Sequence, residues 1–299
     1  MGEIAATGLG SWDTDADLPD AALRERVLAH PRFTEAVHTL IDNMIAAGAA
    51  DKSLDAIFKD AGRYGVAFVA IYLHLTGGLT LPRLKGMAAA LSSPGRARAV
   101  LLYMRYLGYI TRGAHLPGDP ELFVPTQRCL TAWSSHLRAA LQAAAVIEPQ
   151  AQPVVDRFGE PEVFAAFARR HTQILIAVMA EAQNHTSPFV RIFLHRHAGS
   201  QILWTLIKAD EGQTVPPTRT RPLVIAEIAR RFSVSRTHVR RVLGAAAKNE
   251  LVVLHPDDTV GFTQAFQAFL GDFYADQMVW LLVAASHVQL AVSSLIAAA

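Results

Sequence analysis

The sequence predicts a mainly α-helical protein built from two similar units, and three observations support this prediction. The chain has 299 residues, of which 51% are hydrophobic and 18% are charged, so it can bury a large core. Ala and Leu are abundant and long stretches lack Gly and Pro, which favours helices with small β elements. The third observation is a pattern of helices and strands that occurs twice along the chain.

This pattern is clearest at residues 225–254. Apolar residues recur with the i, i+3, i+4, i+7 spacing of one helix face at Ile225, Ile228, Ala229 and Phe232. Ser235 follows a short polar break and is a good N-cap for a second helix. This second helix has its own apolar stripe at Val239, Val242, Leu243 and Ala246. Its other face carries Arg236, Thr237, His238, Arg240, Arg241 and Lys248.

Two short apolar runs, residues 251–254 and 259–262, flank a tight polar turn. Two helices followed by a β-hairpin are typical of a winged helix-turn-helix, whose second helix enters the major groove of DNA. The alternative interpretation is an ordinary helical hairpin with a solvated basic face. That alternative predicts mixed charges, but the acidic residues Glu227 and Glu250 stand only at the ends of the stretch.

The same order of elements is expected earlier, at residues 80–124. Ser93 is the expected N-cap of the second helix there, with Pro94 at its first position. The two copies align with a separation of 140 residues at Thr80 and of 142 residues at Arg98. An internal duplication explains this alignment and favours the winged interpretation over the helical hairpin.

Long apolar helices are expected on both sides of each copy. The periodicity predicts them at residues 20–26, 31–48, 54–75 (interrupted near residues 62–65), 126–145, 163–183, 189–208 and 263–294. The chain is therefore expected to divide into a tail at 1–18, a first unit at 19–145, a linker at 146–160 and a second unit at 161–299.

The charges are unevenly distributed along a chain whose net charge is only +2. Residues 82–112 and residues 217–255 each carry a net charge of +6, which leaves −10 for the remainder. Two basic segments on an acidic body predict a polyanionic partner that binds at two places. The first segment supplies the candidate DNA-binding residues Arg96, Arg98, Arg105 and Arg112.

Other chemistries have little support in the sequence. The single cysteine, Cys129, excludes an internal disulfide and a cysteine-rich zinc site, and its apolar neighbours favour a buried thiol over an oxidation sensor. His195 and His197 point about 200° apart if they lie on one helix, so a metal site is not predicted. Motifs for nucleotide binding or nucleophilic catalysis are absent from the sequence, and neither a cofactor nor an enzyme activity is expected.

The ends of the chain predict no targeting segment. No signal peptide is expected at the N-terminus. Residues 278–299 contain no Asp, Glu, Lys or Arg and are long enough to span a bilayer. Polar residues interrupt this stretch and no basic cluster flanks it, so we expect a helix buried between other helices rather than a membrane span.

The arrangement resembles the MarR family of bacterial transcription regulators, in which helices before and after a winged helix form a two-fold dimer. The resemblance covers most of residues 20–299 and rests on the order of elements and on the motif at 225–254. It implies that the two units form a pseudo-dimer within one chain. It also implies that a small organic ligand binds between the helical body and the winged helices. The chain departs from the family at the second wing tip, where Asp257 and Asp258 replace the arginine that the family often places there.

Together these features predict a cytoplasmic, sequence-specific regulator of transcription that binds double-stranded DNA. It is expected to act as a monomeric pseudo-dimer or as a homodimer, with basic side chains on phosphates and a few side chains on base edges. Two alternatives stay open, because plasmid replication initiators also carry two winged helices in one chain and winged helices also serve as protein-interaction scaffolds.

Overall fold

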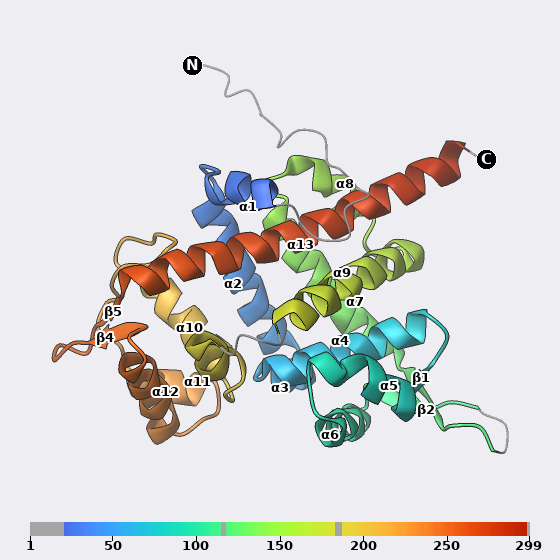
Figure 1. Cartoon of the computed structure of the whole chain (residues 1–299), viewed down its shortest axis with the longest axis horizontal. Helices are drawn as coiled ribbons and strands as arrows, with labels where there is room; N and C mark the ends of the chain where they lie inside the picture. The colour runs from blue at the N-terminus through green and yellow to red at the C-terminus, as the bar shows by residue number, and fades with distance from the viewer. Residues whose placement is uncertain (1–20, 115–117, 183–186, 298–299) are drawn as a thin grey trace.

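The computed structural model describes residues 21–114, 118–182 and 187–297, without the side chains of residues 90, 179–182 and 290–297. Within these residues the fold is mainly helical, with two small antiparallel sheets (Figure 1). The predicted tail at residues 1–18 lies outside the described residues.

The first half runs from α1 to α7. Its elements are α1 (Ala21–Leu28), α2 (Phe33–Ala50), α3 (Lys52–Phe58), α4 (Ala61–Leu75), β1 (Leu79–Thr80), α5 (Leu81–Met87), a 3₁₀ turn (Ala88–Ala90), α6 (Pro94–Tyr106), β2 (Ile110–Arg112), β3 (Leu122–Pro125) and α7 (Gln127–Ala144).

The second half begins in the predicted linker, which contains a 3₁₀ turn (Pro149–Ala151) and α8 (Gln152–Asp156). The remaining elements are α9 (Pro161–Ala182), a π-helical turn (Val190–Leu194), α10 (Gly199–Lys208), α11 (Ile225–Arg231), α12 (Arg236–Lys248), β4 (Val252–Leu254), β5 (Val260–Phe262) and α13 (Gln264–Ala297).

The two sheets have similar plans. In the first, β3 lies between β1 and β2, with Leu79 opposite Phe123 and Ile110 opposite Pro125. In the second, β4 pairs with β5, and the segment before α11 takes the place that β1 has in the first sheet. There Thr220 donates its backbone N–H to the Val260 carbonyl at 2.9 Å.

Local capping sets the start of both second helices, as the sequence predicts. The Ser93 hydroxyl accepts a hydrogen bond from the Arg96 N–H at 3.3 Å at the start of α6. The Ser235 hydroxyl accepts one from the His238 N–H at 3.0 Å at the start of α12. Each serine satisfies one backbone donor that the first helical turn leaves unpaired.

The break in the predicted helix at 54–75 is displaced from its glycines. The helix is interrupted between α3 and α4. There the Asp60 carboxylate caps α4 by accepting a hydrogen bond from the Arg63 N–H at 3.0 Å. Gly62 and Gly65 lie inside α4. A Cβ at Gly65 would lie 3.2 Å from the Leu91 side chain, so this glycine permits close approach instead of ending a helix.

The prediction of one continuous helix at 189–208 is wrong. The π-helical turn ends at Leu194, and residues 195–198 form a turn before α10 begins. Ala198 has a left-handed φ of 57°, and a Cβ at Gly199 would come within 2.6 Å of the Phe193 carbonyl oxygen. The chain therefore folds back on itself here, and only glycine fits at the contact.

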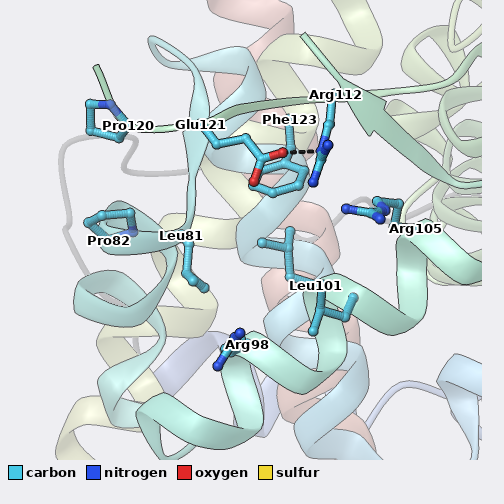
Figure 2. Close-up of a pocket in the computed structure, with 10 residues that line it drawn as sticks. Leu81, Pro82, Arg98, Leu101, Arg105, Arg112, Pro120, Glu121 and Phe123 are labelled. Carbon is cyan, nitrogen blue, oxygen red and sulfur yellow. Dashed lines mark ion pairs between the residues drawn. The ribbon is translucent and has the colours of Figure 1, made fainter. Parts of the chain in front are cut away.

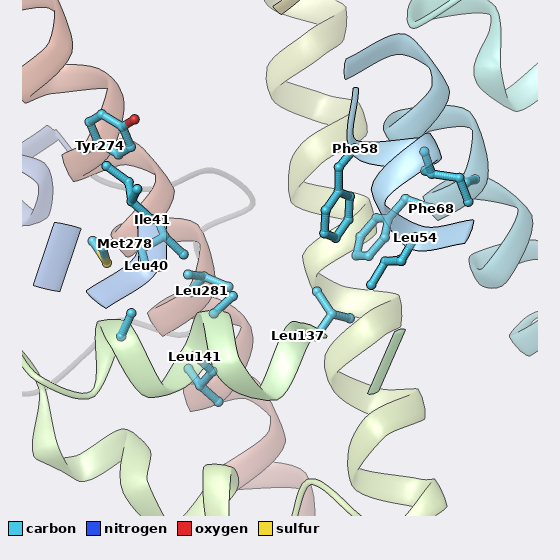
Figure 3. Close-up of a cluster of buried hydrophobic side chains, with 14 of the residues drawn as sticks. Leu40, Ile41, Leu54, Phe58, Phe68, Leu137, Leu141, Tyr274, Met278 and Leu281 are labelled. Atoms are coloured by element: carbon cyan, nitrogen blue, oxygen red, sulfur yellow. The ribbon is translucent and has the colours of Figure 1, made fainter. Parts of the chain in front are cut away.

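Helices at corresponding places in the two halves make corresponding contacts. α2 packs against α7 as α9 packs against α13. Across the halves, α4 packs against α9 as α10 packs against α2, and α7 also packs against α13. Such reciprocal contacts are the pattern that a two-fold relation between similar halves produces. Apolar side chains of α2, α7 and α13 form part of this core (Figure 3).

α13 is buried along much of its length, as expected for the C-terminal stretch. Met278, Leu282 and Val288 are each no more than 2% exposed, and α13 contacts α1, α7 and α9. Burial is thus confirmed as far as Val288, and the side chains from residue 290 onwards lie outside the description. No helix in the described part of the chain has both the length and the apolarity that a bilayer crossing requires.

Two histidines lie in the aromatic core where α4, α7 and α9 meet. His136 is 2% exposed and shares a 3.0 Å hydrogen bond with the Tyr64 hydroxyl, and His171 is 5% exposed against the ring of Phe68. Burial lowers the pKa of His136 to about 3 and that of His171 to about 4. Both imidazoles are therefore neutral in the folded protein at neutral pH.

We predict that the folded state loses stability as the pH falls below about 6.5. The unfolded chain takes up protons on both imidazoles near that pH, whereas the folded chain does so only near pH 4 and below. Each histidine then contributes a slope of up to about 1.4 kcal/mol per pH unit. Urea denaturation at pH 7.5, 6 and 5 measures how the free energy of unfolding changes with pH.

The variant His171→Phe is expected to show a shallower slope than the wild type. His287→Phe is the matched control, because that side chain is exposed in the folded chain, and it should keep the wild-type slope. Equal slopes for His171→Phe and the wild type would contradict the assignment.

Candidate nucleic-acid interface

α12 presents one apolar face to the protein and one polar face to solvent. Val239, Val242, Leu243 and Ala246 are each at most 4% exposed, and the helix packs against α11 and β4. Their spacing of three and four residues places them on one side of the helix. The opposite side of the helix therefore faces outwards.

The outward face of α12 is strongly basic. The predicted DNA-binding residues of α12 that are exposed are Arg236, Thr237, Arg240, Arg241 and Lys248. None of the four cations forms an ion pair with a described residue. Arg241 and Lys248 also line a shallow hollow of about 500 Å³ along the helix. The face thus offers uncompensated positive charge to a polyanion.

His238 differs from the other predicted residues because it also holds α12 in place. Its Nε2–H donates to the His197 carbonyl oxygen at 2.7 Å, and its side chain is only partly exposed. Beside it, the Arg196 guanidinium donates to the Arg241 carbonyl oxygen at 3.2 Å. Burial, followed by the nearby positive charge of Lys59, lowers the pKa of His197. The N-terminal half of α12 is therefore docked on the turn at residues 195–198.

The structure divides the four candidate arginines of the first half into two groups. Arg98 and Arg105 lie on the exposed side of α6 and form no ion pair within the described residues. Arg96 is paired with the Asp60 carboxylate, and Arg112 is paired with Glu121 across the β2–β3 hairpin. Only the first two are immediately available to an external anion.

One chain of contacts joins α6 to α12. Asp60, which binds Arg96, follows Lys59, and the Lys59 carbonyl accepts the Ala198 N–H at 2.7 Å. Ala198 in turn follows His197, whose carbonyl binds His238. α6 and α12 are thus connected through residues 59–60 and 195–198, although these segments lie far apart in the sequence.

The acidic tip of the second hairpin has a basic partner. The Arg219 guanidinium donates to Asp257 Oδ2 at 2.7 Å and to the Thr259 hydroxyl at 3.0 Å. A hydrogen bond from the Thr259 hydroxyl, followed by the charge of Arg219, holds the pKa of the Asp257 carboxyl below its usual range. The repulsion between this tip and a phosphate is therefore smaller than the sequence of the tip alone suggests.

Sequence reasoning missed Arg196 and Arg219 as parts of this surface. Arg196 lies between His195 and His197 in the turn before α10, and Arg219 lies in a loop before α11. The alignment of the two copies offered a signal for Arg219, because it precedes Thr220, which matches Thr80 at the start of the first copy.

The other candidate residues do not form a site. Cys129 is fully buried on α7, and burial raises the pKa of its thiol to about 12, which agrees with the expected buried thiol. His195 and His197 lie in a turn instead of on the expected helix. Within the described residues, no three His, Cys, Asp or Glu side chains gather in a way that could hold a metal ion.

Comparisons with known proteins identify no relative of this chain. No family model matches it, and no curated protein or solved structure is similar to it.

We predict that Asp60→Ala destabilises the protein by about 1–3 kcal/mol, because it removes both the cap of α4 and the partner of Arg96. Arg96→Ala removes only the ion pair, in which the guanidinium is 42% and the carboxylate 10% exposed, and should cost less than Asp60→Ala because the cap remains. Urea denaturation of both variants measures the difference. Equal losses would show that the cap contributes little.

Proposed function

We propose that this protein is a sequence-specific regulator of transcription that binds double-stranded DNA. The observation that carries the proposal is the row of exposed cations without ion pairs on α12, the second helix of a helix pair that is followed by a β-hairpin. A helix in this position fits the major groove, where Arg and Lys bind phosphates or the edge of guanine. The role requires a cytoplasmic location.

We also propose that each half is a winged helix-turn-helix unit and that the two units form a pseudo-dimer. The order α5, α6, β2, β3 matches α11, α12, β4, β5, and reciprocal helix contacts between the halves support the proposal. α6 and α12 lie on the same side of the molecule, away from α1 and the C-terminal part of α13 (Figure 1). One duplex could then contact both helices.

The two units are expected to contribute unequally. α12 keeps Arg236, Arg240, Arg241 and Lys248 available, whereas Arg96 and Arg112 of the first unit are held in ion pairs. We therefore propose that α12 provides most of the base contacts and that the first unit mainly supports binding.

We predict that Arg240→Ala and Arg241→Ala weaken DNA binding. Each should cost about 1–3 kcal/mol if the side chain contacts a base, or act equally on all sequences if it contacts phosphate. Duplexes selected from a random pool with the purified chain, titrated by fluorescence anisotropy at two salt concentrations, measure the effect. Arg26→Ala in α1 is the matched control, since this exposed arginine lies away from α6 and α12.

The salt dependence of duplex binding distinguishes the proposed function from a protein-interaction scaffold. A DNA-binding protein loses affinity steeply as salt rises, because its cations release counterions from the phosphates. Duplex binding that does not depend on salt, or that survives both substitutions unchanged, would favour a protein-interaction scaffold. Binding sites at an origin instead of at promoters would favour a replication initiator.

We further predict that the selected DNA site is asymmetric. In the alignment of the two copies, Ala99 corresponds to Arg241 and Gly95 corresponds to Thr237. Arginine prefers the O6 and N7 edge of guanine, whereas Ala and Gly read little beyond a thymine methyl. The half-sites should differ in sequence and lie about one helical turn apart. The selected consensus and the mass of the complex test this, and a perfect palindrome bound by one chain would contradict it.

A further inference from the structure

A groove on the first half has properties that the proposed DNA contact leaves unexplained. It lies between the start of α5, the outer side of α6 and the β2–β3 hairpin, and its volume is about 410 Å³ (Figure 2). Its apolar lining is formed by Leu81, Pro82, Leu101, Leu102, Pro120 and Phe123. An apolar groove of this kind binds apolar side chains more readily than it binds a hydrated phosphate backbone.

The rim of the groove is basic. It carries the guanidinium groups of Arg98, Arg105 and Arg112 against the single carboxylate of Glu121. Glu121 is bound to Arg112 (Figure 2), so Arg98 and Arg105 remain without an ion pair among the described residues. The groove therefore has an apolar floor and a net positive rim.

An exposed apolar stripe extends the groove along α6. Leu102 is 45% exposed and Tyr106 is 83% exposed, and their spacing of four residues places both on the side of the helix that carries Arg98. The Tyr106 ring stacks on Tyr103 with centroids 6.4 Å apart. Large apolar side chains that gather at a surface in this way mark an interaction site.

The stripe is confined to the first copy. At the positions that match Leu102 and Tyr106, separated from them by 142 residues, α12 has Gly244 and Lys248. The position of Arg98 is matched by Arg240 in α12. The same backbone therefore presents a small and basic surface in one copy and a bulky, apolar and basic surface in the other.

We propose that the groove beside α6 binds an acidic amphipathic helix of a partner protein. Apolar side chains at i, i+3 and i+4 of that helix fill the groove over Leu101, Leu102 and Phe123, and its carboxylates pair with Arg98 and Arg105. The inference goes beyond DNA binding: the groove shares Arg98, Arg105 and Arg112 with the predicted DNA-binding set, but none of its residues belongs to α12, to which the proposed function assigns most of the base contacts.

The test uses the full chain and a labelled synthetic peptide of about 15 residues, long enough for four helical turns. The peptide carries Leu on one face and Glu on the other. One control peptide has the same composition in scrambled order, and a second has Lys in place of Glu. Fluorescence anisotropy should show affinity for the first peptide at least about tenfold above both controls. Equal affinity for the scrambled peptide would overturn the proposal.

Three variants separate this proposal from the DNA proposal. Leu102→Ser and Arg105→Ser should each weaken peptide binding by about tenfold or more. Arg240→Ser should leave peptide binding unchanged while it weakens binding to a random-sequence duplex. Both substituted α6 side chains are exposed, and circular dichroism checks that the variants fold.

The outcomes are distinguishable. Loss of duplex binding in Leu102→Ser, with peptide binding unchanged, would show that the groove is a DNA surface and overturn the proposal. Loss of peptide binding in the α6 variants supports it even if Arg240→Ser has no effect on DNA, which would count against α12 as the DNA-binding helix.

Discussion

The positions of α6 and α12 depend on the apolar contact between α7 and α13. α7 begins two residues after β3 ends, and α13 begins two residues after β5 ends, so each long helix is a short and direct continuation of its hairpin. Leu137 and Leu141 of α7 and Leu281 of α13 are each at most 4% exposed in this core (Figure 3). Because close-packed helices resist small displacements, this contact, together with those of α1 with α13 and of α4 with α9, fixes how the two halves face each other.

A second, polar connection acts nearer to the proposed interface. The Lys59 carbonyl accepts a hydrogen bond from the Ala198 N–H, which joins residues 59–60 to residues 195–198. Asp60 also binds Arg96 of α6, and the His197 carbonyl also binds His238 of α12. α6 and α12 are thus connected both through the apolar core and through these polar contacts.

The two halves show how one backbone plan can carry two kinds of surface. The helix pairs, hairpins and serine caps correspond in both copies, and these features depend on local sequence and on apolar spacing. The outward side chains have diverged without affecting them, because an exposed position contributes little to the fold. The surface that each half presents is therefore a property of its side chains and not of its backbone plan.

The sequence alone determined the features that depend on neighbours along the chain. Apolar spacing predicted the buried face of α12, and Ser93 and Ser235 predicted where α6 and α12 begin, because capping acts over three residues. The exposed cations of α12 followed from the same periodicity. Cys129 could be placed in the core because its neighbours Leu130 and Trp133 are apolar.

Only the tertiary structure decided which of the candidate residues have internal partners. Arg96 meets Asp60 across 36 residues and Arg219 meets Asp257 across 38, and no periodicity relates such positions. The turn at residues 195–198 is equally dependent on packing, since the apolar pattern of residues 189–208 suits one helix but Gly199 must approach the Phe193 carbonyl. Long-range contacts of this kind arise from the way helices pack, and that information is not local to any stretch of the chain.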